Sequence, residues 1–427
     1  MNGEVRPTSR TLAALIPLGI ANHAVLTGSR VIVSLDALSM GASPFTVGVL
    51  VALYAFLPMF LSVAAGRIVD RIGARRPMLA GSLAVGIAAT LPVVFPGLPS
   101  LFIGATLLGI GFMAFQLAAQ NTTGEIGGPA SRARNFSLLA LGYSVSSFVG
   151  PLLAGFAIDH FGFRAAFGIF ALIPLIPIVV LARGGLALPG PHARGMVAHH
   201  GGVVALLRHR TLRRVFAANA LMSLGWDLHT IFVPIYGARI GLSASQIGGV
   251  LSSFAAATFV VRFFMPTIAR RLREHQVLAA ALLLSGGVFF AFPFLQSVTA
   301  LFALSFTLGL GLGAGQPVVM ALLHTHAPPG RLGEAAGVRM ALVNSMSCVA
   351  PVVLGAIGAS VGIVPVFWAV GACLDGRALR AARRALAPAR SYALRFNRSV
   401  KCLRNFATLG ATTTAQYGWA GLRAKYS

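Results

Sequence analysis

The sequence predicts an all-α integral membrane protein with a twelve-helix plan, built as two similar six-helix halves. Hydrophobic residues make up 56% of the 427 residues and charged residues only 10%, and a water-soluble domain could not bury so much apolar surface. Apolar runs of about 20 residues recur along the chain, the length of a membrane-spanning helix. The second half also repeats the first in a constant register. Because hydrocarbon offers backbone groups no hydrogen-bond partner, these runs are predicted to span as helices.

The apolar runs place eleven complete spans along the chain. They fall at about 11–36, 46–66, 77–95, 101–120, 136–158, 165–182, 212–236, 246–269, 277–294, 299–322 and 336–360. A twelfth run begins at Ile363 and meets Asp375 after about a dozen residues, so the twelfth helix is predicted to be truncated. The predicted domains are an N-terminal half (1–182), a central cytoplasmic loop (183–211) and a C-terminal half (212–374).

Residues 375–427 differ in composition from the rest of the chain. They contain eleven Arg and Lys against one acid, and both lysines of the protein. We interpret this segment as a non-native or disordered basic tail that arises from a shifted reading frame. A genuine tail attracted to anionic lipid is the alternative. Coding DNA in which no other frame continues the apolar twelfth span would contradict the frameshift interpretation.

The formal charge of +25 raises the alternative of nucleic-acid binding, but the distribution of arginine argues against it. Eighteen arginines lie in the segments predicted to be cytoplasmic, and two lie in the segments on the other side. The eighteen are Arg6, Arg10, Arg67, Arg71, Arg75, Arg76, Arg132, Arg134, Arg183, Arg194, Arg208, Arg210, Arg213, Arg214, Arg270, Arg271, Arg273 and Arg331; the two are Arg164 and Arg239. Such a bias orients membrane proteins, so the N-terminus is predicted to be cytoplasmic and the protein to lie in a bacterial-type inner membrane.

An internal repeat appears when the chain is shifted by 200 positions. The shift aligns Gly48 with Gly248, Gly109 with Gly309, Gln116 with Gln316, Pro151 with Pro351 and Gly155 with Gly355. Two parallel six-helix halves would be related by an axis along the membrane normal.

The loop between the second and third spans carries Gly66, Asp70, Arg71, Gly73 and Arg75. This segment resembles the Gly-x-x-x-Asp-Arg-x-Gly-x-Arg/Lys loop of the major facilitator superfamily, where the loop is part of the cytoplasmic gate. Glycine permits close helix contact, and the aspartate can accept bonds from a helix terminus or an arginine. The alternative is a basic loop that only fixes topology.

The fifth span contains Gly150, Pro151 and Gly155. This pattern is similar to the Gly-Pro motif that antiporters of the same superfamily carry in span five, and the resemblance implies export. Proline bends a helix and the flanking glycines let another helix approach. An ordinary kinked and tightly packed helix is the alternative, because Ala350-Pro351 in the eleventh span has a similar pattern.

The chain departs from the family pattern at two places. In the second half Pro266 and Arg270 replace the glycine and the aspartate of the gate loop, so only the first half is expected to keep the charged latch. Proton-coupled members commonly carry an arginine in span four, four residues before a glycine pair, where this chain has Ala105. That departure weakens the expectation of the usual proton coupling.

Ionisable groups inside the spans are few, and each needs a partner or an aqueous cavity because it is costly in hydrocarbon. Arg30 in span one and Asp227 in span seven are the main candidates. Arg30 is predicted to bind an anionic group of a substrate or to pair with Asp36 or Asp227, and Asp227 to carry a proton. A static buried pair is the alternative. Further candidates for the wall of the site are Asn22, Gln116, His229, Gln316 and Asn344.

These features predict a secondary active transporter that moves a small organic solute by alternating access, as a proton-coupled exporter. Uptake of a small organic anion, or a membrane protein made inactive by its altered C-terminus, are the alternatives. No nucleotide-binding, nucleophile or zinc-type motif is found, so neither an enzyme nor a cofactor is expected. The expected partners are a small-molecule substrate, membrane lipid and protons, with no nucleic acid, and the protein is expected to be a monomer.

Overall fold

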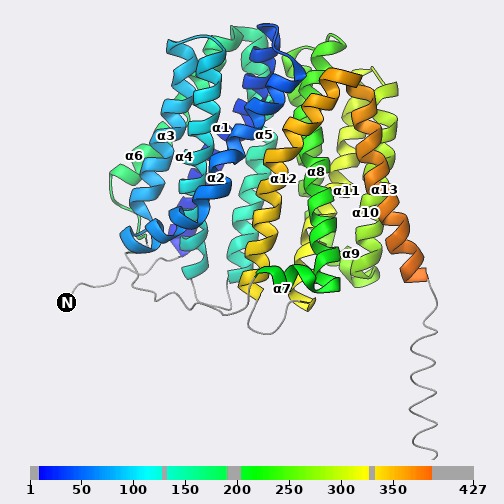
Figure 1. Ribbon diagram of the computed structural model, residues 1–427. Helices are drawn as coiled ribbons and strands as arrows, with labels where there is room; N and C mark the ends of the chain where they lie inside the picture. The colour runs from blue at the N-terminus through cyan, green and yellow to red at the C-terminus, as the bar shows by residue number, and fades with distance from the viewer. Residues whose placement is uncertain (1–8, 127–131, 189, 191–202, 327–331, 387–427) are drawn as a thin grey trace, which may run out of the picture. The chain divides into compact units, whose positions relative to one another are not determined.

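The computed structural model describes residues 9–126, 132–188, 190, 203–326 and 332–386, and every regular element within them is a helix (Figure 1). In the first half these are α1 (Ser9–Ser39), α2 (Pro44–Ile72), α3 (Arg75–Val94), α4 (Leu98–Glu125), α5 (Arg132–Leu172) and α6 (Leu175–Ala182). In the second half they are α7 (Val203–Arg208), α8 (Arg210–Arg239), α9 (Ala244–Arg271), α10 (Glu274–Ala291), the 3₁₀ turn η2 (Phe292–Phe294), α11 (Val298–His326), α12 (Leu332–Val361) and α13 (Ile363–Leu386).

Nine segments among the described residues are long and apolar enough to cross a membrane. One of them, Arg134–Ala182, combines the fifth and sixth predicted spans. The helix α8 is absent from the nine, and its sequence carries Arg210, Arg213, Arg214, Asp227 and Arg239. The helix α13 is absent because its apolar part, Ile363–Gly376, is short, as the sequence predicts for the twelfth span.

The fifth and sixth spans meet at a bend rather than at a loop. Gly162 interrupts the helical run of α5 with φ 77° and ψ 172°, a conformation that glycine adopts without a steric penalty. Twelve residues further on, Pro174 precedes α6. The chain therefore reverses at Gly162, where the sequence analysis ends one span at 158 and begins the next at 165.

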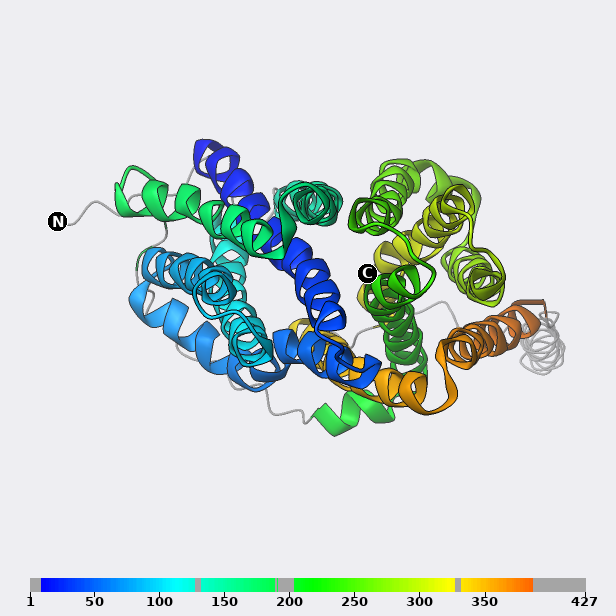
Figure 2. The same cartoon turned by 90° about the horizontal axis from the view of Figure 1, so that it is seen from above.

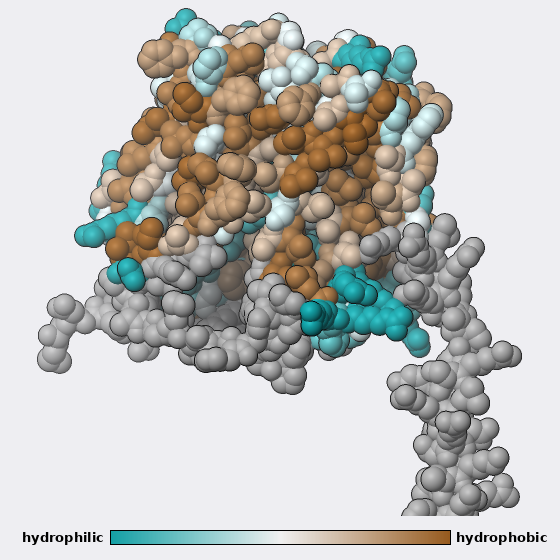
Figure 3. Space-filling model, in the orientation of Figure 1, coloured by the Kyte–Doolittle hydropathy of each residue, from teal (hydrophilic) through white to brown (hydrophobic). Residues whose placement is uncertain are grey.

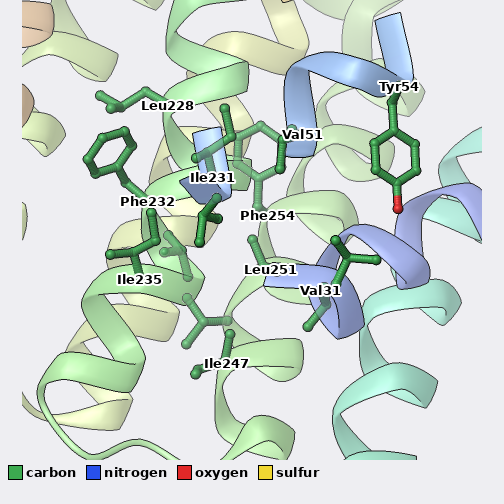
Figure 4. Packing of buried hydrophobic residues seen from close by; sticks show 14 of the residues in the cluster. Val31, Val51, Tyr54, Leu228, Ile231, Phe232, Ile235, Ile247, Leu251 and Phe254 are labelled. Carbon is green, nitrogen blue, oxygen red and sulfur yellow. The ribbon is translucent and has the colours of Figure 1, made fainter. Parts of the chain in front are cut away.

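The helices of residues 9–379 gather in two groups, one formed by α1 to α6 and the other by α8 to α13 (Figure 2). One buried cluster of hydrophobic side chains reaches across both groups. Figure 4 shows part of it, with Val31 and Val51 of the first group near Leu251 and Phe254 of the second.

Large apolar side chains also lie on the surface of the helices, as a lipid environment requires. Phe263 is 71% exposed and Phe294 is 72% exposed. In Figure 3 apolar residues cover the middle of the visible face, and hydrophilic residues lie toward its ends. A contiguous apolar surface of this extent is not stable in water.

Glycine lets the two groups approach each other along two reciprocal seams. A Cβ at Gly48 of α2 would overlap the carbonyl oxygen of Pro351 in α12, and a Cβ at Gly248 of α9 would overlap the carbonyl oxygen of Pro151 in α5. Each half thus places a glycine against the proline of the other half, in the register that the 200-residue repeat predicts.

The seams lie toward one end of the bundle. Gly155 of α5 packs on the first residues of α9, and Gly355 of α12 packs on the first residues of α2. Because α2 and α9 begin directly after the turns at 40–43 and 240–243, the seams approach that end of the bundle. We call it the arginine-poor end, since the sequence places most loop arginines at the opposite, arginine-rich end.

Contacts divide the chain into a unit of residues 1–379 and a second unit of residues 380–427. Most of the predicted basic tail, residues 387–427, lies outside the described residues, as does 191–202 of the predicted central loop. The helix α13 continues through the predicted boundary at 375 as far as Leu386.

Candidate transport site

Arg30 lies nine residues before the end of α1 and makes no hydrogen bond to any described residue. Its guanidinium carbon lies 5.4 Å from the centre of the Tyr54 ring in α2, within the range of a cation–π contact. Its Nε atom is buried and has no hydrogen-bond partner. A guanidinium offers five N–H donors, so these donors are available to an acceptor that is not part of the described protein.

Asp227 supplies the opposite charge from the second half. Its side chain is buried, and its oxygens accept hydrogen bonds from the Ser347 hydroxyl of α12 at 3.3 and 3.0 Å. Arg30 is near enough to act on Asp227 electrostatically, yet the described atoms form no ion pair between them. The predicted pairing of Arg30 with Asp36 is not formed either. A cation of α1 and an anion of α8 therefore influence each other without forming an ion pair among the described residues.

His229 lies two residues beyond Asp227 and points to different partners. Its Nε2 atom is 3.0 Å from the Ser305 hydroxyl of α11, and its ring stacks on Phe254 of α9 at 4.4 Å. The neighbouring Trp226 meets the same Phe254 ring edge-on at 4.7 Å. His229 is thus held within the second half, rather than beside the carboxylate.

The first half carries a corresponding aromatic cluster. The His23 ring lies 4.8 Å from Tyr143 of α5 and 5.3 Å from Phe112 of α4, and His23 Nδ1 lies 2.6 Å from the Ser146 hydroxyl. The Tyr143 hydroxyl is buried without a hydrogen-bond partner. The cluster belongs to the same part of α1 as Arg30, which acts electrostatically on His23.

Arg262 of α9 connects the two halves inside the membrane. Its guanidinium donates to the Ser144 hydroxyl of α5 at 2.8 Å and to Gln316 Oε1 of α11 at 3.0 Å. Gln316 is therefore a partner of Arg262. Gln116, its counterpart in the repeat, makes no hydrogen bond among the described residues.

The two asparagine candidates differ in their surroundings. Asn22 is fully buried and donates from Nδ2 to the Ser82 hydroxyl of α3 at 3.0 Å, so it joins two helices of the first half. Asn344 of α12 is half-buried and makes no hydrogen bond among the described residues. Asn22 therefore links α1 to α3 through Nδ2, while its Oδ1 is buried without a partner, and both asparagines stay candidates.

The gate loop is described in part. Gly73 ends α2 with φ 80° and donates its N–H to the Val69 carbonyl at 2.9 Å, which explains the glycine at this position of the motif. A Cβ at Gly66 would meet no described atom within 4 Å, so the close helix contact expected there is not formed. Arg71 is exposed, and the side chain of Asp70 lies outside the described part.

Arg75 ties the start of α3 to the segment after α6. Its Nη2 atom donates to the carbonyl oxygens of Gly184 and Leu186 at 2.7 Å each. These two bonds close one side of a pocket of about 610 Å³ that Arg71 and Arg76 also line. The arginine of the motif thus binds backbone carbonyls at the start of the predicted central loop.

The span-five motif has two faces. Gly150 packs against Thr27 and Ala24 of α1, where a Cβ would overlap the Thr27 hydroxyl. Pro151 and Gly155 face α9 instead. The motif therefore joins the core of the first half to the seam with the second half.

Three polar residues outside the predicted candidates make contacts between helices. Ser347 binds Asp227, Arg262 joins the halves, and Asp159 at the end of α5 binds the start of α9. The repeat offered a signal for Ser347, because the 200-residue shift aligns it with Ser147 and aligns Asp227 with Thr27, on helices that pack together in the first half as well.

Comparison with known proteins decides the family. The model of the Major Facilitator Superfamily matches residues 10–351. The chain belongs to the Major Facilitator Superfamily. Members with efflux names are among its relatives. It is 27% identical to the tetracycline resistance protein, class G, of Vibrio anguillarum over 347 residues, which cover 77% of this chain and 84% of that protein.

Two further relatives of the superfamily match a similar share of the chain. Identity is 28% to the tetracycline resistance protein, class C, of Escherichia coli, covering 79% of this chain and 86% of that protein. The chain is 22% identical to the multidrug resistance protein MdtG of Dickeya zeae, and the match covers 71% of this chain and 75% of that protein. These matches support an efflux-type secondary transporter.

Solved structures of the superfamily share the fold. A POT family transporter in complex with a thioalcohol-conjugated peptide aligns with a TM-score of 0.73 at 14% identity, covering 88% of this chain and 97% of that one. The peptide transporter POT in complex with sulfate aligns with a TM-score of 0.73 at 16% identity, and the alignment covers 88% of this chain and 94% of that one. The twelve-helix superfamily fold predicted from the sequence is confirmed.

Proposed function

We propose that the chain exports a small organic solute across the inner membrane, driven by inward flow of protons. The observation that carries the proposal is a pair of opposite charges inside the spans, one from each half, that form no ion pair among the described residues. Arg30 Nε is buried without a hydrogen-bond partner, and the Asp227 carboxylate is held by the Ser347 hydroxyl. Buried charges that lack a direct partner are costly in a membrane and mark transport pathways. In this proposal Arg30 binds an anionic or electron-rich group of the solute, and Asp227 is the group that exchanges a proton.

Asp227 has the surroundings that a coupling carboxyl needs. One serine hydroxyl holds it in place, and its side chain is buried. The family's span-four arginine is replaced by Ala105, so the coupling group must lie elsewhere in the spans. We assign proton coupling to Asp227. Solute binding near Arg30 would change the field at Asp227 and so link the solute to the proton.

The two seams supply the moving parts for alternating access. Helix contacts between glycine and backbone close the arginine-poor end. The positive-inside rule places the arginine-rich end in the cytoplasm, so the seams close the outer side of the membrane. Rocking of one half against the other about these seams would expose the central site to each side in turn.

Transport into inverted membrane vesicles tests the proposal. Tetracycline is the first probe, because two relatives are named for resistance to it. A pH gradient, acidic inside the vesicle, is expected to drive accumulation, and collapse of the gradient to abolish it. A thermal-shift screen of organic anions and cations extends the search, since a bound substrate stabilises the folded state.

Uptake of a small organic anion is the second candidate, favoured by the unpaired guanidinium of Arg30. Right-side-out vesicles with an acidic exterior distinguish the two directions, because an importer would accumulate the anion there. A protein that binds and moves none of these probes, and gains transport only when an intact twelfth span is restored, would instead support the inactive product.

A further inference from the structure

We infer that Asp159 is a gating residue that holds the outer end of the bundle closed by capping a helix of the other half. Its carboxylate oxygens accept the backbone N–H groups of Ala244 at 3.0 Å and Ser245 at 2.8 Å. These are the first two residues of α9. The inference extends the alternating access proposed above by assigning the lock of the outer gate.

The cap completes the hydrogen bonds of the first turn of α9. The start of a helix leaves four N–H groups without an intrahelical acceptor. Ser243 and Gln246 satisfy two of them within α9: the Ser243 hydroxyl accepts from Gln246 N, and Gln246 Oε1 accepts from Ser243 N. Asp159 accepts the other two from across the interface. A negative charge at this position also meets the positive end of the helix dipole.

Release of the cap is costly, which makes it a lock. If α5 and α9 separate at this end, two N–H groups lose a charged acceptor and must be solvated by water. Charged hydrogen bonds are the stronger class in proteins. Gly155, one turn before Asp159, packs on the Ala244 carbonyl and the Ser245 Cα, so the carboxylate is held at the place where the backbones are closest.

The internal repeat shows that the lock exists on one side only. The second seam joins α12 to α2 through Gly355, which packs on Pro44 and Phe45. The 200-residue shift places Ala359 where the first seam has Asp159, and Pro44 where it has Ala244. Alanine has no carboxylate and proline has no N–H, so the second seam lacks the acceptor of the cap and one of its two N–H donors. The packing is symmetric, and the polar lock is not.

This asymmetry supplies a matched pair of variants. Asp159→Ala gives α5 the residue type of α12, and Ala244→Pro gives α9 the residue type of α2. The backbone tolerates the proline, because Ser243 (φ −68°, ψ 159°) has nearly the same conformation as Ser43 before Pro44 (φ −70°, ψ 158°). Proline is also favourable at the first position of a helix. Ala244→Ser keeps the N–H and is the control.

Spin labels across the outer end measure the lock without any substrate. In a background without cysteine, labels replace Phe95 and Phe294, which are 66% and 72% exposed, one in each half. Asp159→Ala is expected to raise the ratio of wide to narrow label distances about tenfold, as loss of a charged cap at a helix start implies. Ala244→Pro is expected to act in the same direction with a smaller effect, and Ala244→Ser to leave the ratio unchanged.

The double variant decides whether the two residues act through each other. In the Asp159→Ala background, Ala244→Pro is expected to add nothing, because its acceptor is already gone. Unchanged distances in Asp159→Ala, or additive effects in the double variant, would overturn the inference. A wild-type protein that moves no solute while its labels respond as expected would contradict the proposed function and leave the lock standing.

Discussion

At the scale of single residues, the site depends on charges that lack direct partners. Asp227 and Arg30 influence each other between the halves, but each binds a neutral neighbour, Ser347 for the carboxylate and the Tyr54 ring for the guanidinium. Such charges respond to an incoming solute more than a closed ion pair would, because no strong bond has to be broken first.

Replacement of Asp227 by Asn separates coupling from binding. The variant keeps the shape and the bond to Ser347 but cannot exchange a proton. Accumulation driven by a pH gradient is expected to fall by at least about tenfold, a change of roughly 1.4 kcal/mol in the barrier, while exchange of solute without a gradient continues. Gradient-driven transport equal to that of the wild type would remove Asp227 from coupling, and Asp227→Glu is the control.

Arg262 makes a second prediction at this scale. Arg262→Met removes the bonds to Ser144 and Gln316 and keeps the apolar stem. Polar bonds between helices in a membrane contribute about 0.5–2 kcal/mol, so the free energy of unfolding in detergent is expected to fall by a similar amount. In that background Ser144→Ala should have no further effect. If Ser144→Ala lowers stability equally in both backgrounds, the bridge is not the cause.

At the scale of elements, the helices meet through glycine and proline backbones at the seams. Gly48, Gly155, Gly248 and Gly355 each stand where a side chain would meet the backbone of the other half. Backbone atoms cannot rotate away as a flexible side chain can, so these positions tolerate no added Cβ without movement of a whole helix.

Gly248→Ala tests this contact against helical glycines that face open space. The added methyl group would overlap the Pro151 carbonyl oxygen, and overpacking of this kind costs about 1–3 kcal/mol. A lower melting temperature and slower transport are expected. Gly168→Ala and Gly287→Ala are the controls, because a Cβ meets nothing within 4 Å at either position. Equal effects at all three would show that only helix propensity is involved.

Sequence patterns predicted the elements better than their contacts. The spans follow from apolar length, and the equivalence of Gly48 with Gly248 and of Pro151 with Pro351 follows from the repeat. The bend at Gly162 and the contacts between these glycines and prolines were not predicted. The hydrogen-bond partners of Asn22, Gln316 and Arg75 could not be predicted from the sequence. A helix in lipid is apolar on all sides, so its sequence does not show which side faces which neighbour. Asp159 could be seen as a polar residue after the Gly-Pro motif, but its partner is 85 residues away.

At the scale of the whole molecule, orientation in the membrane is a prediction that labelling can check. The positive-inside rule places the turn at Phe95 outside and α7 inside. A cysteine in place of Phe95, in a background that lacks Cys348, Cys373 and Cys402, is expected to react in intact cells with a maleimide that does not cross membranes. One in place of Arg208 should react only after permeabilisation. The reverse pattern would invert the proposed topology and with it the direction of transport.

The reciprocal seams also set an order of events during synthesis. Gly48 enters the membrane with α2, but the proline that covers it is at position 351, about 300 residues later in the chain. Ribosomes add roughly 5–20 residues per second, so Gly48 of α2 waits about 15 to 60 seconds until Pro351 of α12 has been made. Gly155 of α5 waits about a third as long for the start of α9. The seam that forms first is the one carrying the Asp159 cap. With the lock proposed above, the nascent chain would close one side of the arginine-poor end before the helix that completes the other side has been made.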